Sequence, residues 1–240
     1  MKKTAVSVYS SSMVKILSLG GSIVAPDGVD TAFLKEFKAL VESYLKKDPE
    51  RKLILVIGGG APARVYQKAF REIDTNAPAD VQDWIGITAT RLNAQLVASI
   101  FRGYCKDPVV TDPSSDISFT GRILVGAGWK PGFSTDFDAV YLAERFGGKT
   151  VVNLSNITKV FSADPKNNPD AKPLDKISWV DFQKIVGAEW IPGKNVPFDP
   201  IAAQKAKELD LDVIVAGGKD IKNISNILEE KPYIGTLICP

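Results

Sequence analysis

The chain has 240 residues, of which 45% are hydrophobic, and its 30 basic and 28 acidic residues give a net charge of +2. This composition is typical of a globular protein and excludes a polyanion-binding tail, so we expect no nucleic-acid or membrane partner. Histidine is absent, and Cys105 and Cys239 lie far apart in the sequence. Histidine-dependent catalysis, a disulfide framework and a metal site built from protein side chains are therefore not expected, and a reducing cytoplasm is the predicted location.

The order of predicted elements indicates the fold class. Residues 1–12 are polar and read as a disordered N-terminal extension ahead of one domain at 13–240. Strands are predicted at 14–19, 53–57, 108–111, 122–125, 150–154, 213–216 and 236–239. Helices are predicted at 31–47, 62–70, 80–104, 135–146, 177–186, 200–209 and 220–229, and 161–173 is predicted to be a surface loop or lid. The alternation predicts an α/β fold, a three-layer α/β/α sandwich around a mainly parallel sheet.

Two glycine-rich turns follow the first two predicted strands, Gly20-Gly21-Ser22 and Gly58-Gly59-Gly60. Bare glycine backbone at a helix entrance presents N–H groups that stabilise a negative charge. Neither turn has the P-loop pattern or the spaced glycines of a dinucleotide fingerprint. Backbone geometry alone explains either turn taken singly, but the pair suggests one site for a phosphate donor and one for a phosphate acceptor.

Four other side chains are candidates for chemistry, and each also has a purely structural explanation. Arg64 follows the second glycine turn and suits a phosphate, but it also fits the solvated face of a helix. Asp83 fits a surface carboxylate near a helix start. Asp136 lies in the first turn of a predicted helix and Asp199 fits an N-cap, although such a carboxylate can also orient a nearby cation.

Several ordered motifs together resemble the uridylate kinases of the amino acid kinase superfamily, most closely the archaeal type. The likeness runs from about residue 14 to 238. It rests on both glycine turns, on segments 63–66, 83–87 and 90–94, on Pro131-Gly132-Phe133-Ser134-Thr135-Asp136, on Phe161-Ser162-Ala163-Asp164-Pro165, on Asp199-Pro200-Ile201-Ala202-Ala203 and on Gly235-Thr236-Leu237-Ile238. The resemblance implies the amino acid kinase fold and ATP-dependent phosphorylation of UMP to UDP.

The resemblance also implies roles for individual residues. UMP would be bound by Gly59, Asp83, Trp129, Lys130, Pro131, Gly132, Phe133, Ser134 and Thr135. ATP would be bound by Gly21, Ser22, Gly60, Arg64, Ser155, Asn156, Phe161 and Asp164. Arg64, Asp136 and Asp199 would be the catalytic residues, Mg²⁺ would be carried by the nucleotide phosphates, and the chain would form a homo-oligomer, a hexamer by resemblance.

Two positions depart from the pattern. Ser18 stands where bacterial members carry a lysine, and Lys15 lies on the opposite side of its predicted strand. Thr158-Lys159 replaces the usual Asp-Gly before the Phe161 motif. We expect Arg64, with Lys130 or Lys159, to supply the missing positive charge. A kinase of the same fold acting on an acidic amino acid or carbamate, and a non-catalytic nucleotide- or oxyanion-binding relative, remain alternatives.

Overall fold

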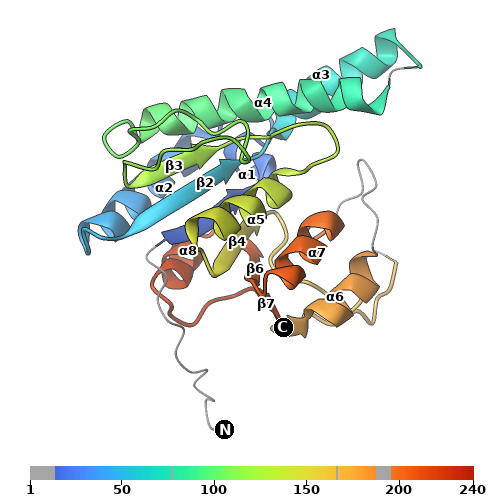
Figure 1. Cartoon of the computed structure of the whole chain (residues 1–240). Coiled ribbons are helices and arrows are strands. Elements are labelled where there is room, and N and C mark those ends of the chain that lie inside the picture. Colours follow the sequence, from blue (N-terminus) through green and yellow to red (C-terminus); the bar gives the residue numbers. More distant parts are fainter. Residues whose placement is uncertain (1–13, 77, 166, 188–195) are drawn as a thin grey trace, which may run out of the picture.

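The structure is a computed structural model that describes residues 14–76, 78–165, 167–187 and 196–240. Within them, seven strands form one sheet in the order β3-β2-β1-β4-β6-β7-β5 (Figure 1). Every neighbouring pair is parallel except β6 with β7, which confirms the mainly parallel sheet. The strands are β1 (Val14–Leu19), β2 (Lys52–Ile57), β3 (Ile123–Gly126), β4 (Thr150–Ser155), β5 (Lys176–Ser178), β6 (Asp212–Gly217) and β7 (Thr236–Cys239).

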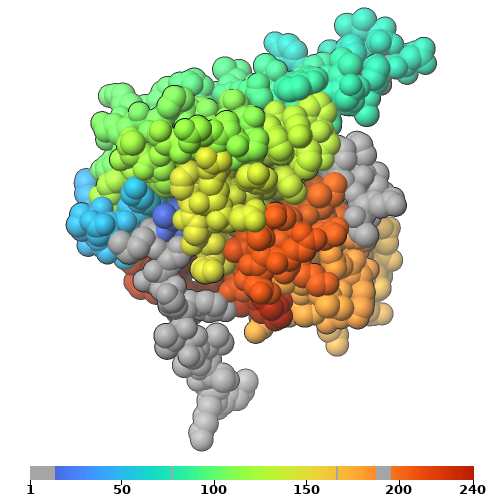
Figure 2. Space-filling model, viewed as in Figure 1, coloured from blue at the N-terminus to red at the C-terminus, as the bar shows by residue number. Residues whose placement is uncertain are grey.

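Helices cover both faces of this sheet. They are α1 (Gly21–Val24), α2 (Thr31–Lys46), α3 (Gly60–Ile73), α4 (Ala79–Ile100), α5 (Thr135–Phe146), α6 (Trp179–Val186), α7 (Pro200–Glu208) and α8 (Ile221–Leu228). The end of α3 and the start of α4 project beyond the rest of the molecule (Figures 1 and 2).

Strand alternation divides the core into two layers. Leu17 and Leu19 of β1 pack in one hydrophobic cluster with α2, α4 and α8, whereas Ile16 packs in a second cluster with α5, α6 and α7. Successive side chains of a strand point to opposite faces, so one strand supplies both clusters. The predicted three-layer α/β/α sandwich is therefore confirmed.

Some predicted elements differ from the observed ones. Lys176–Ser178 is a strand rather than the entry to a helix, because its three residues are too few to show a period and α6 begins directly after the N-cap Ser178. The segment 108–111 makes only an isolated bridge, Val110 with Gly126. The predicted extension at 1–12 lies outside the described residues. We infer a single domain for 13–240, since one sheet takes strands from both ends of the described chain.

The two glycine turns are pressed together by the strands that carry them. Leu19 of β1 pairs with Ile57 of β2, so the two parallel strands end level with each other. A Cβ placed on Gly21 would lie 1.9 Å from the Gly60 nitrogen, and one on Gly58 would lie 2.3 Å from the Gly21 nitrogen. Gly60 also has a φ of +64°, a conformation that favours glycine. The sequence needs glycine here because one main chain lies against another.

Gly21→Ala should therefore lower the free energy of unfolding by about 3 kcal/mol or more, since neither backbone can yield without breaking the sheet edge. Urea unfolding measures the change. Gly103→Ala is the matched control, because nothing lies within 4 Å of a Cβ there. Equal stability of the two variants would contradict the close contact.

Candidate active site

A cavity of about 300 Å³ opens at the carboxyl end of β2, between the second glycine turn, α3, α4 and the loop before α5. Crevices at this edge of an open parallel sheet are the usual place for ligands. Its lining residues are Gly59, Gly60, Ala63, Arg64, Gln67, Asp83, Gly86, Ile87, Thr90, Gly128, Phe133, Ser134 and Thr135. The cavity thus brings together predicted residues from four separate segments of the chain.

Arg64 lies on the solvent side of this cavity. It belongs to α3, which begins at Gly60, and its side chain is exposed. Its Nη2 donates a hydrogen bond to the carbonyl of Pro26, at 2.6 Å. The guanidinium therefore lies beside the segment that follows α1, and its remaining N–H groups could donate to an anion.

Asp83 of α4 contacts the acceptor loop, which we define as residues 128–134. Its Oδ2 accepts a hydrogen bond from the main-chain N–H of Gly132, at 3.1 Å. Phe133, at the end of the loop, lines the cavity, as do Ser134 and Thr135. Asp83 therefore anchors the outer part of the loop, a contact that sequence spacing did not predict.

The remaining predicted loop residues lie beside the cavity rather than in its lining. The Trp129 and Phe133 rings pack with centroids 5.1 Å apart, and the Lys130 ammonium lies 3.8 Å from the Trp129 ring centroid. Pro131 and Gly132 complete the turn between them. The Lys130 charge is thus turned toward aromatic faces, an arrangement that stabilises a cation at an exposed site.

Two carboxylates meet behind the loop at the starts of α5 and α7. The main-chain N–H of Asp199 donates to Asp136 Oδ2 at 3.3 Å, and Ser18 Oγ donates to Asp136 Oδ1 at 3.0 Å. Asp199 Oδ1 accepts from the Ala202 N–H at 2.8 Å, which makes it the predicted N-cap of α7. Ser18, which replaces the bacterial lysine, is therefore directed at Asp136 rather than at Arg64.

Burial changes the acidity of both carboxyls. Burial raises the pKa of Asp136 to about 6, and the charge of Asp199 adds to the shift while the Ser18 hydroxyl opposes it. Burial also raises the pKa of Asp199, against the hydrogen bonds that it accepts. Charged carboxylates are disfavoured in low dielectric and beside a like charge. The hydrogen-bond donors to Asp136 are neutral groups, the Ser18 hydroxyl and the Asp199 N–H, so these contacts supply no compensating positive charge.

Asp138 is a buried carboxyl that the sequence analysis missed. It is 1% exposed, and its Oδ2 accepts from the Trp129 N–H at 3.3 Å, while its Oδ1 has no hydrogen-bond partner. Burial raises its pKa to about 8, with the Trp129 N–H acting against the shift and Asp136 adding to it. Asp138 is therefore neutral over most of the physiological pH range and holds the inner end of the acceptor loop.

Of the predicted donor residues, Gly21, Ser22 and Ser155 lie together at the first glycine turn. Gly21 and Ser22 begin α1, and the Gly20 N–H donates to the Leu154 carbonyl at 2.8 Å, which places the turn beside Ser155. Asn156 follows and is exposed. Farther along, Phe161 forms a bridge with Pro173, and the Asp164 carboxylate accepts from the Asn167 side chain at 2.8 Å, as a turn residue does.

The two lysines near these departures are paired away from the cavity. Lys15 Nζ lies 2.7 Å from Glu230 Oε1, in agreement with its predicted position on the opposite side of β1. Lys159 pairs with Asp175, and Thr158 packs against Gly217. The expectation that Lys159 supplies charge to the phosphates therefore receives no support from its contacts.

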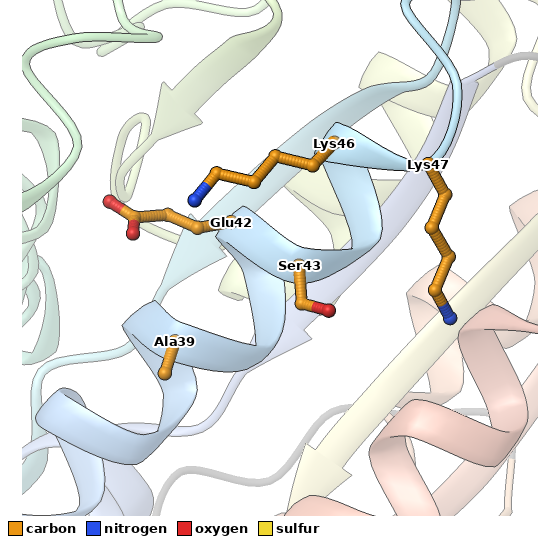
Figure 3. Close-up of a pocket in the computed structure, with 5 residues that line it drawn as sticks. All are labelled: Ala39, Glu42, Ser43, Lys46 and Lys47. Atoms are coloured by element: carbon orange, nitrogen blue, oxygen red, sulfur yellow. The ribbon is translucent and has the colours of Figure 1, made fainter.

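A larger hollow, of about 450 Å³, lies on the outer face of α2 and is lined by Ala39, Glu42, Ser43, Lys46 and Lys47 (Figure 3). Four of these residues belong to α2 and Lys47 is its C-cap, so no second element lines the hollow. It belongs to the solvated face of α2 and carries no convergent chemistry. Among the described residues, no group of three or more Asp, Glu, Cys or His side chains could hold a metal ion, and no helix is long and apolar enough to cross a membrane.

Comparison with known proteins identifies the class that the fold and the cavity define. Residues 13–217 match the amino acid kinase family, and the chain belongs to this family. Membership makes it a phosphotransferase.

Within this family, the chain is similar to individual uridylate kinases. The chain is 33% identical to the uridylate kinase of Thermoplasma volcanium, over 93% of this chain and 96% of the relative, and 32% identical to that of Methanospirillum hungatei, over 93% of each. Among solved structures, it resembles the crystal structure of uridylate kinase from Archaeoglobus fulgidus, with a TM-score of 0.78, 32% identity and coverage of 94% of this chain and 99% of that one.

Asp138→Asn should stabilise the protein most at alkaline pH. The native carboxyl keeps its proton up to about pH 8, whereas an unfolded one loses it near 3.8. The free energy of unfolding of the wild type therefore falls as pH rises through this window, and asparagine removes that dependence. Between the two pKa values we expect the stability of the variant relative to the wild type to rise by about 1.4 kcal/mol per pH unit, while the unpartnered NH₂ of the asparagine adds a cost that is the same at every pH.

Urea unfolding between pH 4 and pH 9 measures this gain. The matched control is Asp27→Asn, which removes an exposed carboxylate in the loop before α2. A constant difference for Asp138→Asn would show that its carboxyl is ionised in the native protein.

Proposed function

We propose that this chain transfers the γ-phosphoryl group of ATP to UMP, giving UDP and ADP. One observation carries the proposal. The second glycine turn, Asp83 and the acceptor loop surround a single cavity next to the first glycine turn. The names of the relatives at about 32% identity, all uridylate kinases, support UMP as the acceptor.

In this proposal, UMP lies in the cavity with its phosphate on the second glycine turn. The main-chain N–H groups of Gly59 and Gly60, where α3 begins, would favour an anion there, since the Ala61 N–H already donates to the Ala25 carbonyl and Pro62 has no N–H. The Asp83 carboxylate is available to a ribose hydroxyl, because carboxylate oxygens accept several hydrogen bonds. The loop from Trp129 to Thr135 would enclose the base, with Phe133, Ser134 and Thr135 at its surface toward the cavity.

ATP would lie on the other side of Gly60, with its phosphates on the first glycine turn. Gly21 and Ser22 supply main-chain N–H groups there, and Ser155 and Asn156 extend that surface after β4. Phe161 and Asp164 would face the nucleoside farther from the phosphates. The direct contact of the two turns supports this arrangement, because phosphates bound on the two turns would lie end to end.

The transfer needs positioning and charge compensation more than covalent chemistry. An oxygen of the UMP phosphate attacks the γ-phosphorus, the bond to the β,γ-bridging oxygen breaks, and ADP leaves. Arg64 would neutralise charge on the transferring group from the solvent side. Asp136 and Asp199 would act from the opposite side by orienting a cation.

Magnesium fits the donor set on that side. Mg²⁺ binds one or two carboxylates together with substrate phosphates, and Asp136 and Asp199 offer such oxygens with neutral partners of their own. When bound with ATP, Mg²⁺ offsets phosphate charge and fixes the geometry of the triphosphate. The protein's part is to keep Asp136 ionised, which its pKa of about 6 allows at neutral pH.

We further propose a cytoplasmic homo-oligomer. Both cysteines are free thiols, as expected in a reducing compartment. Six of the exposed large apolar side chains lie on α3 and α4, the layer at the top of Figure 2, and several such residues on adjacent helices are typical of a protein interface. These residues are Val65, Tyr66, Ile73, Val81, Trp84 and Leu92.

A coupled assay of ADP release tests the acceptor. With ATP and Mg²⁺, we expect UMP to be phosphorylated well ahead of carbamate, glutamate and aspartate, because the proposed contacts of Asp83 and the acceptor loop fit a nucleotide rather than a free carboxylate. CMP is included to measure base preference. Turnover of glutamate, aspartate or carbamate without turnover of UMP would reject the proposal, and UMP binding without any turnover would favour a non-catalytic binding protein.

Arg64→Ala should lower kcat/KM for UMP about tenfold to a thousandfold, because an electrostatic donor to the transferring phosphate is worth a few kcal/mol. Arg71→Ala is the matched control on the same helix. Arg71 is also exposed, and it donates to Gln82 rather than facing the glycine turns. If a folded Arg64→Ala protein has wild-type kinetics, Arg64 is a solvated surface residue with no part in catalysis.

A further inference from the structure

The middle of α4 carries a run of polar residues to which neither the fold nor the proposed reaction assigns a role. Thr90, Arg91 and Asn93 stand within one helical turn, yet their side chains reach two separate parts of the main chain around the cavity. Thr90 and Asn93 are buried, and polar side chains in a core are costly unless they are hydrogen-bonded. Their partners therefore indicate what they do.

Arg91 holds the inner end of the acceptor loop. Its Nε donates to the Gly128 carbonyl at 3.3 Å, and its Nη2 donates to the carbonyls of Trp129 at 2.9 Å and Thr111 at 3.4 Å. The guanidinium is a rigid fork, so contacts with adjacent carbonyls fix both the position and the direction of the chain. A lysine could not make the same set of bonds.

Thr90 and Asn93 extend this contact to both sides. The Gly128 N–H donates to Thr90 Oγ1 at 2.8 Å, and that hydroxyl donates to the Ile87 carbonyl at 2.6 Å. Asn93 Nδ2 donates to the carbonyls of Gly58 at 2.9 Å and Gly59 at 3.0 Å. The same helical turn therefore grips the acceptor loop on one side and the second glycine turn on the other.

We propose that Thr90, Arg91 and Asn93 are positioning residues that fix the distance between the acceptor loop and the second glycine turn, and so match the site to a nucleoside monophosphate. The inference rests on the proposed function, in which the turn holds the phosphate and the loop encloses the base. A helix suits this task because its rise, about 1.5 Å per residue, does not vary with the state of the loop. An acceptor of another length would lose one of the two contacts.

Arg122 offers a matched control elsewhere in the same chain. It also donates to three main-chain carbonyls, those of Arg51, Leu45 and Asp48. Arg122 directly precedes β3, so these contacts lie at the amino end of the strand, whereas the cavity lies at the carboxyl end of the sheet. Its contacts join α2 to β2 and β3 and touch nothing that lines the cavity. A loss of stability that comes only from removing an arginine with three carbonyl partners should therefore appear equally in the Arg122 variant.

The experiment compares Arg91→Lys with Arg122→Lys. Both variants should have a lower Tm. Only Arg91→Lys should raise the KM for UMP, about tenfold, because a misplaced loop binds its ligand less tightly. The KM for ATP should change less than about twofold in both variants. Hydrogen exchange of the amides from Gly128 to Thr135 should accelerate in Arg91→Lys and stay unchanged in Arg122→Lys. Calorimetric titration with UMP gives the affinity without turnover.

A second pair covers the case in which Arg91→Lys fails to fold. Thr90→Val removes the acceptor for the Gly128 N–H while keeping the side-chain shape, and Thr90→Ser keeps the hydroxyl. Thr90→Val should raise the KM for UMP and Thr90→Ser should restore it.

The outcomes separate the two levels of inference. Wild-type protein that releases no ADP with UMP rejects the proposed function together with this role. Active wild type with the same KM for UMP in both lysine variants, or in both Thr90 variants, rejects only the positioning role and makes Arg91 a stability residue like Arg122.

Discussion

The contact between two glycine turns is the constraint on which the rest of the site depends. Parallel pairing of β1 with β2 brings both strand ends level, and main chain then lies against main chain without room for a Cβ. Because the turns touch, any anions that they bind must lie close together. Such anions repel each other, so groups around the turns must compensate their negative charge.

Charge around the turns is arranged asymmetrically. Arg64 is exposed on one side, so a ligand can reach its guanidinium from the solvent. Asp136 and Asp199 are held on the other side by neutral hydrogen-bond donors. Burial raises the pKa of each carboxyl, and the charge of Asp199 raises that of Asp136 further. Ser18 has a place in this arrangement, because its small hydroxyl bonds Asp136, whereas a lysine there would pair with the carboxylate that we propose for a cation.

Local sequence signals predicted the layers of the fold and the residues at strand ends, because glycine turns, N-caps and apolar alternation act over a few positions. Asp199 was predicted as an N-cap for that reason. The burial of Asp138 and the carbonyl contacts of Arg91 could not be predicted from spacing, since their partners lie in other segments. The motif 90–94 was noticed in the sequence, but only the structure shows which main-chain groups it holds. The residue roles in catalysis stay predictions.

The central place of β1 has a consequence for synthesis of the protein. One edge of β1 pairs with β2, which follows soon after it, but the other edge pairs with β4, whose residues 150–155 come more than a hundred positions later. A ribosome adds about 5–20 residues per second, so that edge stays open for several seconds after β1 has emerged. An unpaired strand edge is a template for intermolecular pairing. The nascent chain is therefore most exposed to aggregation before β4 is made, and this is when a chaperone would protect it.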